Sequence, residues 1–296
     1  MSAPKERISR MNNTELFYKT KKISGSVIFI AIVAMMVVLL LFPIVAMISV
    51  SLKEGTRVFT TPVKWIPEKF IWYNYIEVFL KMDVLTGFRN SILVTVGSIV
   101  SILAIGIPAA YALSKLNFYF KIPTYCIVLA SQMFAPIIVV IPLYQMLNRW
   151  GWIDSYIGLI AMNTTFNLAF IVLMLTSHFD NVPKETMEAA IIDGCNKLRT
   201  LLKIVLPISS MGIVVAIIFI FTRTWNEFLF AFTFTSRSNM KTIIVKLYEI
   251  LKNNPAVGIP WHLVMAGAVI TTVPLIILFI SIRNYITGDA TKGAIK

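Results

Sequence analysis

The stretch ISGSVIFIAIVAMMVVLLLFPIVAMISVSL, Ile23–Leu52, runs for thirty residues without a charged side chain. A transmembrane helix needs about 20 mostly apolar residues, whereas the apolar part of a cleavable signal peptide spans only about 7–15. The basic segment Lys5–Lys22 precedes this stretch, which is too long for a signal peptide. We therefore interpret 23–52 as a retained first transmembrane helix that follows an N-terminal segment, 1–22.

Five further apolar windows follow along the chain. Charged residues bound four of them, which lie between Arg89 and Lys115, Lys121 and Arg149, Asp154 and Asp180, and Lys252 and Arg283. The remaining window, fifth in chain order, is uncharged only from Ile204 to Thr222, then meets Arg223 and Glu227 and ends near Thr235. The pattern predicts an all-α integral membrane protein with six transmembrane helices. Small residues crowd the second window (Gly97, Ser98, Ser101, Ala104, Gly106, Ala109, Ala110) and predict close helix–helix packing.

Composition supports the membrane interpretation. Hydrophobic residues make up 57% of the chain and charged residues 14%, against roughly 25% charged residues in soluble domains. The net charge of +13 does not indicate nucleic-acid binding, because no basic segment also carries a groove-reading or base-stacking pattern. The basic residues gather instead at the ends of the apolar windows, where a lipid bilayer favours them.

The distribution of Lys and Arg predicts the orientation. With the N-terminus inside, the cytoplasmic segments carry fifteen of these residues and the outer segments eleven. Six of the eleven lie in the long stretch from Lys53 to Arg89, where the positive-inside rule weakens with distance from a span. We therefore expect a multi-pass protein with both termini in the cytoplasm.

No pattern in the chain indicates catalysis. There is no G-x-x-x-x-G-K-[ST] phosphate-binding loop and no grouping of Ser, His and Asp or of His and Glu. The two cysteines, Cys126 and Cys195, have no metal-binding spacing. We expect no catalytic residue, no metal site and no cofactor on this chain, and hence no enzymatic activity.

The stretch NVPKETMEAAIIDGCNKLRTLLKIVLP, Asn181–Pro207, separates the fourth and fifth windows. Pro183 suits the first turn of a helix and Gly194 suits its end, which predicts a helix of about ten residues, too short to be stable alone. A second helical stretch from Asn196 to Leu206 leads to Pro207 at the start of the fifth span.

The short helix has an apolar side and a charged residue suited to a partner. Met187, Ala190 and Ile191 have the spacing of a helix laid in a groove, and Ala189–Ala190 allows close approach of another surface. Glu188 offers a carboxylate to a basic partner residue, preferably an arginine. The pattern fits equally well a connector that lies on the lipid headgroups or on the underside of the bundle. It therefore leaves open whether the helix binds a partner or only connects two spans.

Polar groups within the spans are candidates for a transport path. Arg223 and Glu227 lie one turn apart near the outer half of the fifth span, with Trp225 and Asn226 between them. Such groups suit a sugar, although an interfacial belt with a snorkelling arginine and an anchoring tryptophan explains them as well. Gln132, Asn163 and Asn167 are weaker candidates that could simply bond across helices.

Seven positions of the loop carry a family resemblance. Glu188, Ala189, Ala190, Gly194, Ile204, Leu206 and Pro207 have the identities and spacing of the EAA motif, so the loop resembles that of ABC-importer permeases. Asn90-Ser91, Ala110-Tyr111-Ala112-Leu113 and Trp225-Asn226-Glu227-Phe228 resemble the maltose-type (MalG-like) carbohydrate branch, the inner membrane component of binding-protein-dependent transport systems. Met211 departs from the proline that such proteins often have there.

The resemblance implies an ABC-importer type I permease bundle in the plasma membrane of a bacterium. It implies an extracellular loop at 53–86, a permease core at 87–286 that contains the EAA loop 181–207, and a cytoplasmic tail at 287–296. The chain would form half of the translocation path for an oligosaccharide or other carbohydrate. Its implied partners are a second permease subunit in a heterodimer, a cytoplasmic ATPase dimer that holds ATP and Mg, and an extracellular solute-binding protein.

The same resemblance implies roles for the loop residues. The helix Pro183–Gly194 would be the coupling helix that docks on the ATPase, with Glu188 facing an ATPase arginine. The alternative is a stand-alone secondary transporter, which would need buried ionisable groups near the membrane midplane. Only Arg223 and Glu227 approach that requirement.

Overall fold

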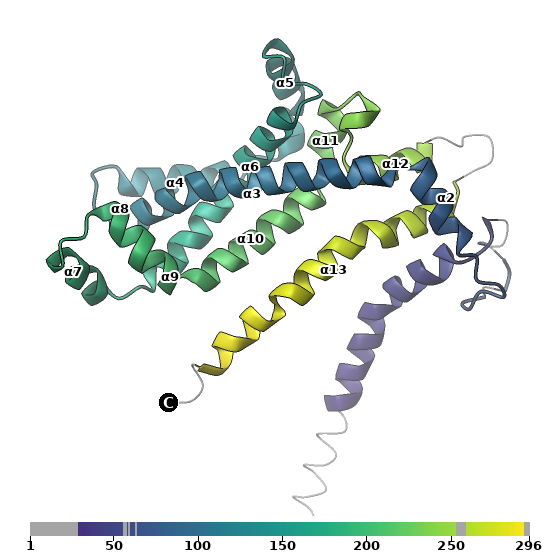
Figure 1. The fold of residues 1–296 in the computed structure, drawn as a ribbon, viewed down its shortest axis with the longest axis horizontal. Coiled ribbons are helices and arrows are strands. Elements are labelled where there is room, and N and C mark those ends of the chain that lie inside the picture. Colours follow the sequence, from purple (N-terminus) through teal and green to yellow (C-terminus); the bar gives the residue numbers. More distant parts are fainter. Residues whose placement is uncertain (1–28, 56–57, 59, 63, 253–258, 293–296) are drawn as a thin grey trace, which may run out of the picture.

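The computed structural model describes residues 29–55, 58, 60–62, 64–252 and 259–292. Over these residues the secondary structure is helical, without a strand, and Figure 1 shows the helices gathered into an elongated bundle. The predicted all-α membrane fold is confirmed. The N-terminal segment 1–22 and the last residues of the predicted tail, 293–296, lie outside the described residues.

Four unbroken helices are long and apolar enough to cross a membrane. They are the first helix (Phe29–Ser51), α3 (Val84–Lys115), α6 (Tyr156–Asp180) and the Trp261–Arg283 part of α13 (Trp261–Lys292). α13 thus continues into the predicted tail, and α3 begins at Val84, before Arg89, which bounds the second predicted window. The third and fifth predicted spans are instead bent pairs of helices, so the described residues hold four spanning helices, or up to six if each pair is one span.

The two bends have local causes. α4 (Lys121–Ser131) and α5 (Pro136–Arg149) meet at 95°, where Pro136 opens α5 and Ala135 before it is extended, with ψ of 125°. Residues 197–208 meet α10 (Ser210–Trp225) at 81°. Such breaks at membrane depth are tolerated where the backbone is buried in protein or lines a cavity.

Short elements occupy the two ends of the bundle. α7 (Lys184–Ile192), α8 (Lys197–Thr200), the π-helical turn η2 (Leu201–Val205) and α9 (Leu206–Ile208) lie at one end in Figure 1. α2 (Tyr73–Lys81) and α12 (Ile243–Lys252) lie at the opposite end. The remaining short helices are α11 (Leu229–Phe234), which follows α10 after a break, and the 3₁₀ turn η3 (Ser238–Met240).

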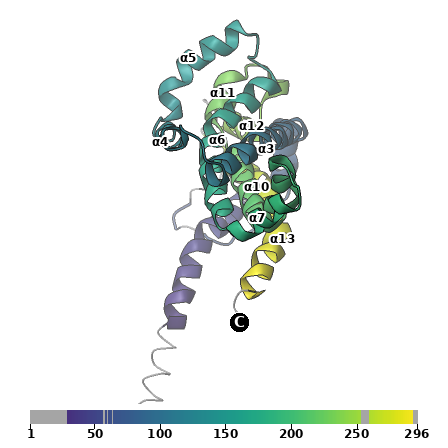
Figure 2. The ribbon, with the colours of Figure 1, turned by 90° about the vertical axis from the view of Figure 1, so that its left-hand side faces the viewer.

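The core lies between α3, α6 and α10. Gly97 of α3 approaches α6 so closely that a Cβ atom there would lie 2.5 Å from Ile160 Cδ1, which explains the predicted crowding of small residues. Ala216 and Ile220 of α10 are buried in one core cluster with Ile102 of α3 and Leu175 of α6. The first helix is different, because it stands away from this bundle in both views and exposes its apolar side chains (Figures 1 and 2).

Candidate functional site

The loop between α6 and α10 contains the short helix that the sequence predicts. α7 spans Lys184–Ile192 and begins directly after Pro183. Gly194 follows two residues after the end of α7, and its φ of +77° is in the left-handed region. The Cys195 N–H donates to the Ala190 carbonyl at 2.9 Å, which is the closing bond of a Schellman motif. Proline and glycine therefore bound α7 as their chemistry predicts.

The side chains of α7 divide into two groups. Ala190 is buried and Met187 packs against the core cluster of the bundle itself, so both face inward in this structure. Glu188 and Ala189 are exposed on the other side. The inward packing of Met187 and Ala190 fits the connector interpretation, while the outward position of Glu188 suits contact with a partner.

Sequence reasoning missed an apolar contribution to this exposed surface. Ile192 is 85% exposed, and Leu198 and Leu202 are 63% and 54% exposed. Ile192 lies one turn after Glu188, a spacing that places two residues on the same helix face. The four-residue spacing of Glu188 and Ile192 in the sequence could have predicted that a charged and an apolar side chain share this surface.

The second half of the loop is fixed to the bundle. The Asn196 side chain caps α8 by accepting a hydrogen bond from the Arg199 N–H at 2.8 Å. Ile204 is half-buried, and Leu206 packs against the core cluster, whereas Pro207 is exposed in α9. These residues join α7 to the bent start of the fifth span.

The start of the loop is also tied to α3. Lys115 Nζ, at the end of α3, donates to the Val182 carbonyl at 2.8 Å, and Ser114 Oγ donates to Asp180 Oδ1 at 2.5 Å. A displacement of α7 would therefore move the ends of both α3 and α10.

A cavity of about 470 Å³ lies where the helix breaks meet α6. Its wall is formed by the junction of α4 and α5, one face of α6, the last turn of α10 and the start of α11. The lining residues are Ser131, Gln132, Phe134, Pro136, Asn163, Thr165, Phe166, Asn167, Ala169, Arg223, Glu227, Leu229 and Phe230. The structure thus brings together the predicted polar candidates Arg223, Glu227, Gln132, Asn163 and Asn167.

Two other candidates do not line this cavity. Trp225 is 1% exposed, and its indole N–H donates to the Thr271 carbonyl of α13 at 3.1 Å. Its ring stacks on Phe221, with centroids 5.5 Å apart. Asn226 is exposed, and its amide donates to the Thr222 carbonyl of its own helix at 2.8 Å. The aromatic surface of the cavity comes instead from Phe166 and Phe230, whose centroids lie 4.9 Å apart.

Glu227 holds the start of α11. Its Oε1 accepts the Phe230 N–H at 2.6 Å and its Oε2 accepts the Ala231 N–H at 3.0 Å. Both carboxylate oxygens thereby satisfy main-chain donors that the helix leaves without partners. Glu227 is an anchor of the cavity wall.

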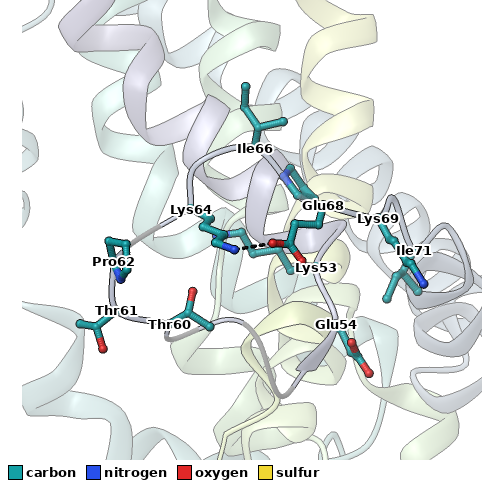
Figure 3. A pocket seen from close by; sticks show the side chains of 11 residues that line it. Lys53, Glu54, Thr60, Thr61, Pro62, Lys64, Ile66, Glu68, Lys69 and Ile71 are labelled. Atoms are coloured by element: carbon teal, nitrogen blue, oxygen red, sulfur yellow. Dashed lines mark hydrogen bonds and ion pairs between the residues drawn. The ribbon is translucent and has the colours of Figure 1, made fainter.

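A second hollow, of about 390 Å³, lies in the loop between the first helix and α2 (Figure 3). Lys53, Lys64 and Lys69 contribute to its lining, and Lys64 forms an ion pair with Glu68. Most of its lining residues come from this one loop, whereas the larger cavity joins several helices.

Comparisons with known proteins identify the family. A family model described as "Binding-protein-dependent transport system inner membrane component" matches residues 102–290. The trehalose/maltose transport system permease protein MalG of Thermococcus litoralis is 32% identical over 266 residues, which cover 88% of this chain and 94% of that protein. The sulfoquinovosyl glycerol transport system permease protein SmoH of Agrobacterium fabrum is 29% identical and covers 86% and 89%.

A solved structure shows the same fold. A chain of a bacterial ABC transporter involved in the import of the acidic polysaccharide alginate matches with a TM-score of 0.77 at 22% identity, over 90% of this chain and 98% of that one. The matched family region includes the loop with α7 and the helices that line the larger cavity. The chain belongs to the family of inner membrane components of binding-protein-dependent transport systems, and it is an ABC-importer permease.

Proposed function

We propose that this chain is the permease subunit of a carbohydrate importer, in which it forms half of the translocation path. The observation that carries the proposal is the cavity at the junction of the bent helices. Interrupted helices at membrane depth are where transporters build substrate sites, because the freed backbone can line an aqueous path.

The lining of the cavity suits a sugar. Gln132 supplies an amide group for hydroxyls, and Asn163 and Asn167 supply their side-chain oxygens, while one N–H of each asparagine donates to a main-chain carbonyl of α6. The Phe166–Phe230 pair supplies an apolar face. The names of two relatives give trehalose/maltose and sulfoquinovosyl glycerol as their cargo, which supports a carbohydrate for this chain.

The loop supplies the coupling. We place the ATPase against the exposed side of α7, with Glu188 paired to an ATPase arginine and with Ala189 and Ile192 beside it. Pro183 and Gly194 bound the helix, and Met187 and Ala190 hold it to the bundle. Ile191, Ile204, Leu206 and Pro207 complete the coupling segment. Closure of the ATPase would pull α7 and, through Lys115 and η2, rotate α3 and α10 as rigid bodies.

The same proposal predicts which partner covers each part of the chain. A second permease subunit would cover the cavity and the exposed first helix, and the ATPase dimer would hold ATP and Mg at the α7 end. Both termini and the tail 287–296 would be cytoplasmic. The loop 53–86 and α12 would face the solute-binding protein outside the membrane.

Co-purification and reconstitution test the function together. A tagged copy of this chain should bring down a second permease and an ATPase, and proteoliposomes of that complex should import sugar only with ATP and the loaded binding protein. Transport by the purified chain alone, driven by an ion gradient, would overturn the proposal in favour of a secondary transporter.

A further inference from the structure

Arg223 is the one cation among the residues that line the larger cavity. It lies in the last turn of α10, beside the face of α6 that carries Asn163 and Asn167. A basic residue at the C-terminal end of a helix is favoured by the helix dipole, which explains why the position tolerates an arginine. The dipole does not explain why the guanidinium shares a cavity with several amides.

No carboxylate in the described part of the chain neutralises Arg223. Glu227, one turn later, is the nearest acidic residue along α10, but both of its oxygens accept main-chain N–H groups of α11. The Arg223 guanidinium instead lies over the ring of Phe170, with Cζ 5.3 Å from the centroid. Among the described residues no acceptor binds the N–H groups of Arg223, so these donors stay available.

We propose that Arg223 makes the cargo of this importer an acidic carbohydrate, by binding a carboxylate or sulfonate on a sugar ring. A planar guanidinium suits such groups because two parallel N–H donors meet two oxygens. One N–H of Asn163 and one of Asn167 donate to main-chain carbonyls of α6, so the side-chain oxygens of these residues would accept from hydroxyls, and the Phe166–Phe230 pair would face the apolar side of the ring. The inference rests on the proposed function and adds the charge of the cargo to it.

The test uses the whole complex with its ATPase, second permease and binding protein in proteoliposomes. The probes are trimers of galacturonate, mannuronate and glucuronate, each paired with the neutral trimer in which every carboxyl is reduced to the alcohol. Because the binding protein is the same in every arm, a change in the acidic-to-neutral uptake ratio on substitution of Arg223 reports this chain.

The wild type should take up at least one acidic trimer better than its neutral partner. Arg223→Gln should lower acidic uptake roughly tenfold or more, the loss expected for a charge-assisted hydrogen bond, while neutral uptake holds. Arg223→Lys should be intermediate, because it keeps the charge without the planar donor pair. Arg149→Gln, which removes an exposed arginine at the end of α5, is the matched control and should keep the wild-type ratio.

Three outcomes would overturn the inference. The first is uptake of neutral trimers alone, and the second is an unchanged ratio in Arg223→Gln; both leave the proposed function intact. The third is an Arg223 effect that appears with phosphatidylglycerol in the vesicles and vanishes in pure phosphatidylcholine, since Arg223 would then bind a lipid headgroup. A complex with neither uptake nor sugar-stimulated ATP hydrolysis would count against the proposed function itself.

Discussion

The loop between α6 and α10 and the cavity are built in opposite ways. The loop is one continuous segment, Asn181–Pro207, whose helix is bounded by a proline and a left-handed glycine. The cavity is assembled from α4, α5, α6, α10 and α11, and its lining residues are spread from Ser131 to Phe230. A functional segment that is continuous in the sequence can be recognised from the spacing of its residues alone. A cavity lined by several helices can be recognised only once the packing of those helices is known.

The two regions also differ in how their charged groups are used. Glu188 of the loop is exposed and available to a partner, while Glu227 of the cavity is fully engaged with α11. Substitution at Glu188 should therefore affect an intermolecular step. Substitutions in and behind the cavity wall should affect the stability of the bundle or the recognition of cargo.

The largest expected effect comes from charge reversal on the loop. Glu188→Lys should reduce ATP-driven uptake to background, because it would place a cation opposite the ATPase arginine that we propose as the partner of Glu188 and would remove that charge-assisted bond. Membrane insertion and thermal stability of the chain should not change, since the side chain is exposed. Proteoliposome uptake and sugar-stimulated ATP hydrolysis measure the loss.

The control for this prediction is Asp193→Lys, which reverses an exposed charge near the other end of the same helix. It should stay close to the wild type, because residues five apart lie on different faces of a helix. Full uptake by Glu188→Lys would contradict the assignment of Glu188 to the ATPase contact.

The next largest effect should arise behind the cavity, at Trp225. Trp225→Phe removes the buried hydrogen bond to the Thr271 carbonyl, which costs about 0.5–1.5 kcal/mol. The melting temperature of the purified complex should fall while the acidic-to-neutral uptake ratio stays the same. A changed ratio at unchanged stability would place Trp225 on the transport path after all.

These two cases show what the sequence could predict. The apolar windows predicted the membrane fold, and Pro183 and Gly194 predicted the short helix α7, because both depend on local chemistry. The role of Trp225 was not accessible, since a tryptophan next to charged residues looks the same whether it meets a sugar or, as here, Phe221 and Thr271. The bends at Ala135 and Ser209 were missed as well, because both windows remain free of charged residues through the break.

A smaller effect on uptake should show whether the loop depends on the backbone conformation of Gly194 or on side-chain contacts at that position. Gly194→Ala forces a residue with a Cβ atom into φ of +77°, at a cost of about 1 kcal/mol, although nothing lies within 4 Å of the added atom. The end of α7 should fray, and uptake should fall severalfold. Hydrogen exchange of the Ala190–Cys195 amides measures the fraying.

Gly151→Ala is the matched control for this glycine. Gly151 has φ of +70°, also with open space around it, but it lies between α5 and α6, away from the loop. The same strain there should leave uptake unchanged. Equal losses of uptake in both variants would show that strain anywhere in the chain, rather than the end of α7, limits transport.

The smallest expected effect tests an assembled contact at the opposite end of the bundle. Lys246 Nζ of α12 is buried and lies 2.7 Å from Oδ2 of Asp83, which precedes α3. The hydrogen bond from Lys246 holds the pKa of Asp83 below its ordinary value. A carboxyl with a lowered folded-state pKa contributes stability above its ordinary pKa, and this contribution is lost as the pH falls through the lowered value.

Acidification should therefore loosen α12, by less than about 1 kcal/mol because the Asp83 side chain is 56% exposed. The protection factors of the α12 amides, which correct for the intrinsic pH dependence of hydrogen exchange, should fall in the wild type only below about pH 4, near and below the ordinary pKa of an aspartate. They should already be reduced at pH 7 in Asp83→Asn, whereas Glu77→Gln, which breaks a neighbouring pair within α2, should behave like the wild type. Asp83 and Lys246 are 163 residues apart, so no local sequence pattern indicates their contact. If Asp83→Asn kept the pH response of the wild type, the Asp83–Lys246 pair would not be what holds α12 in place.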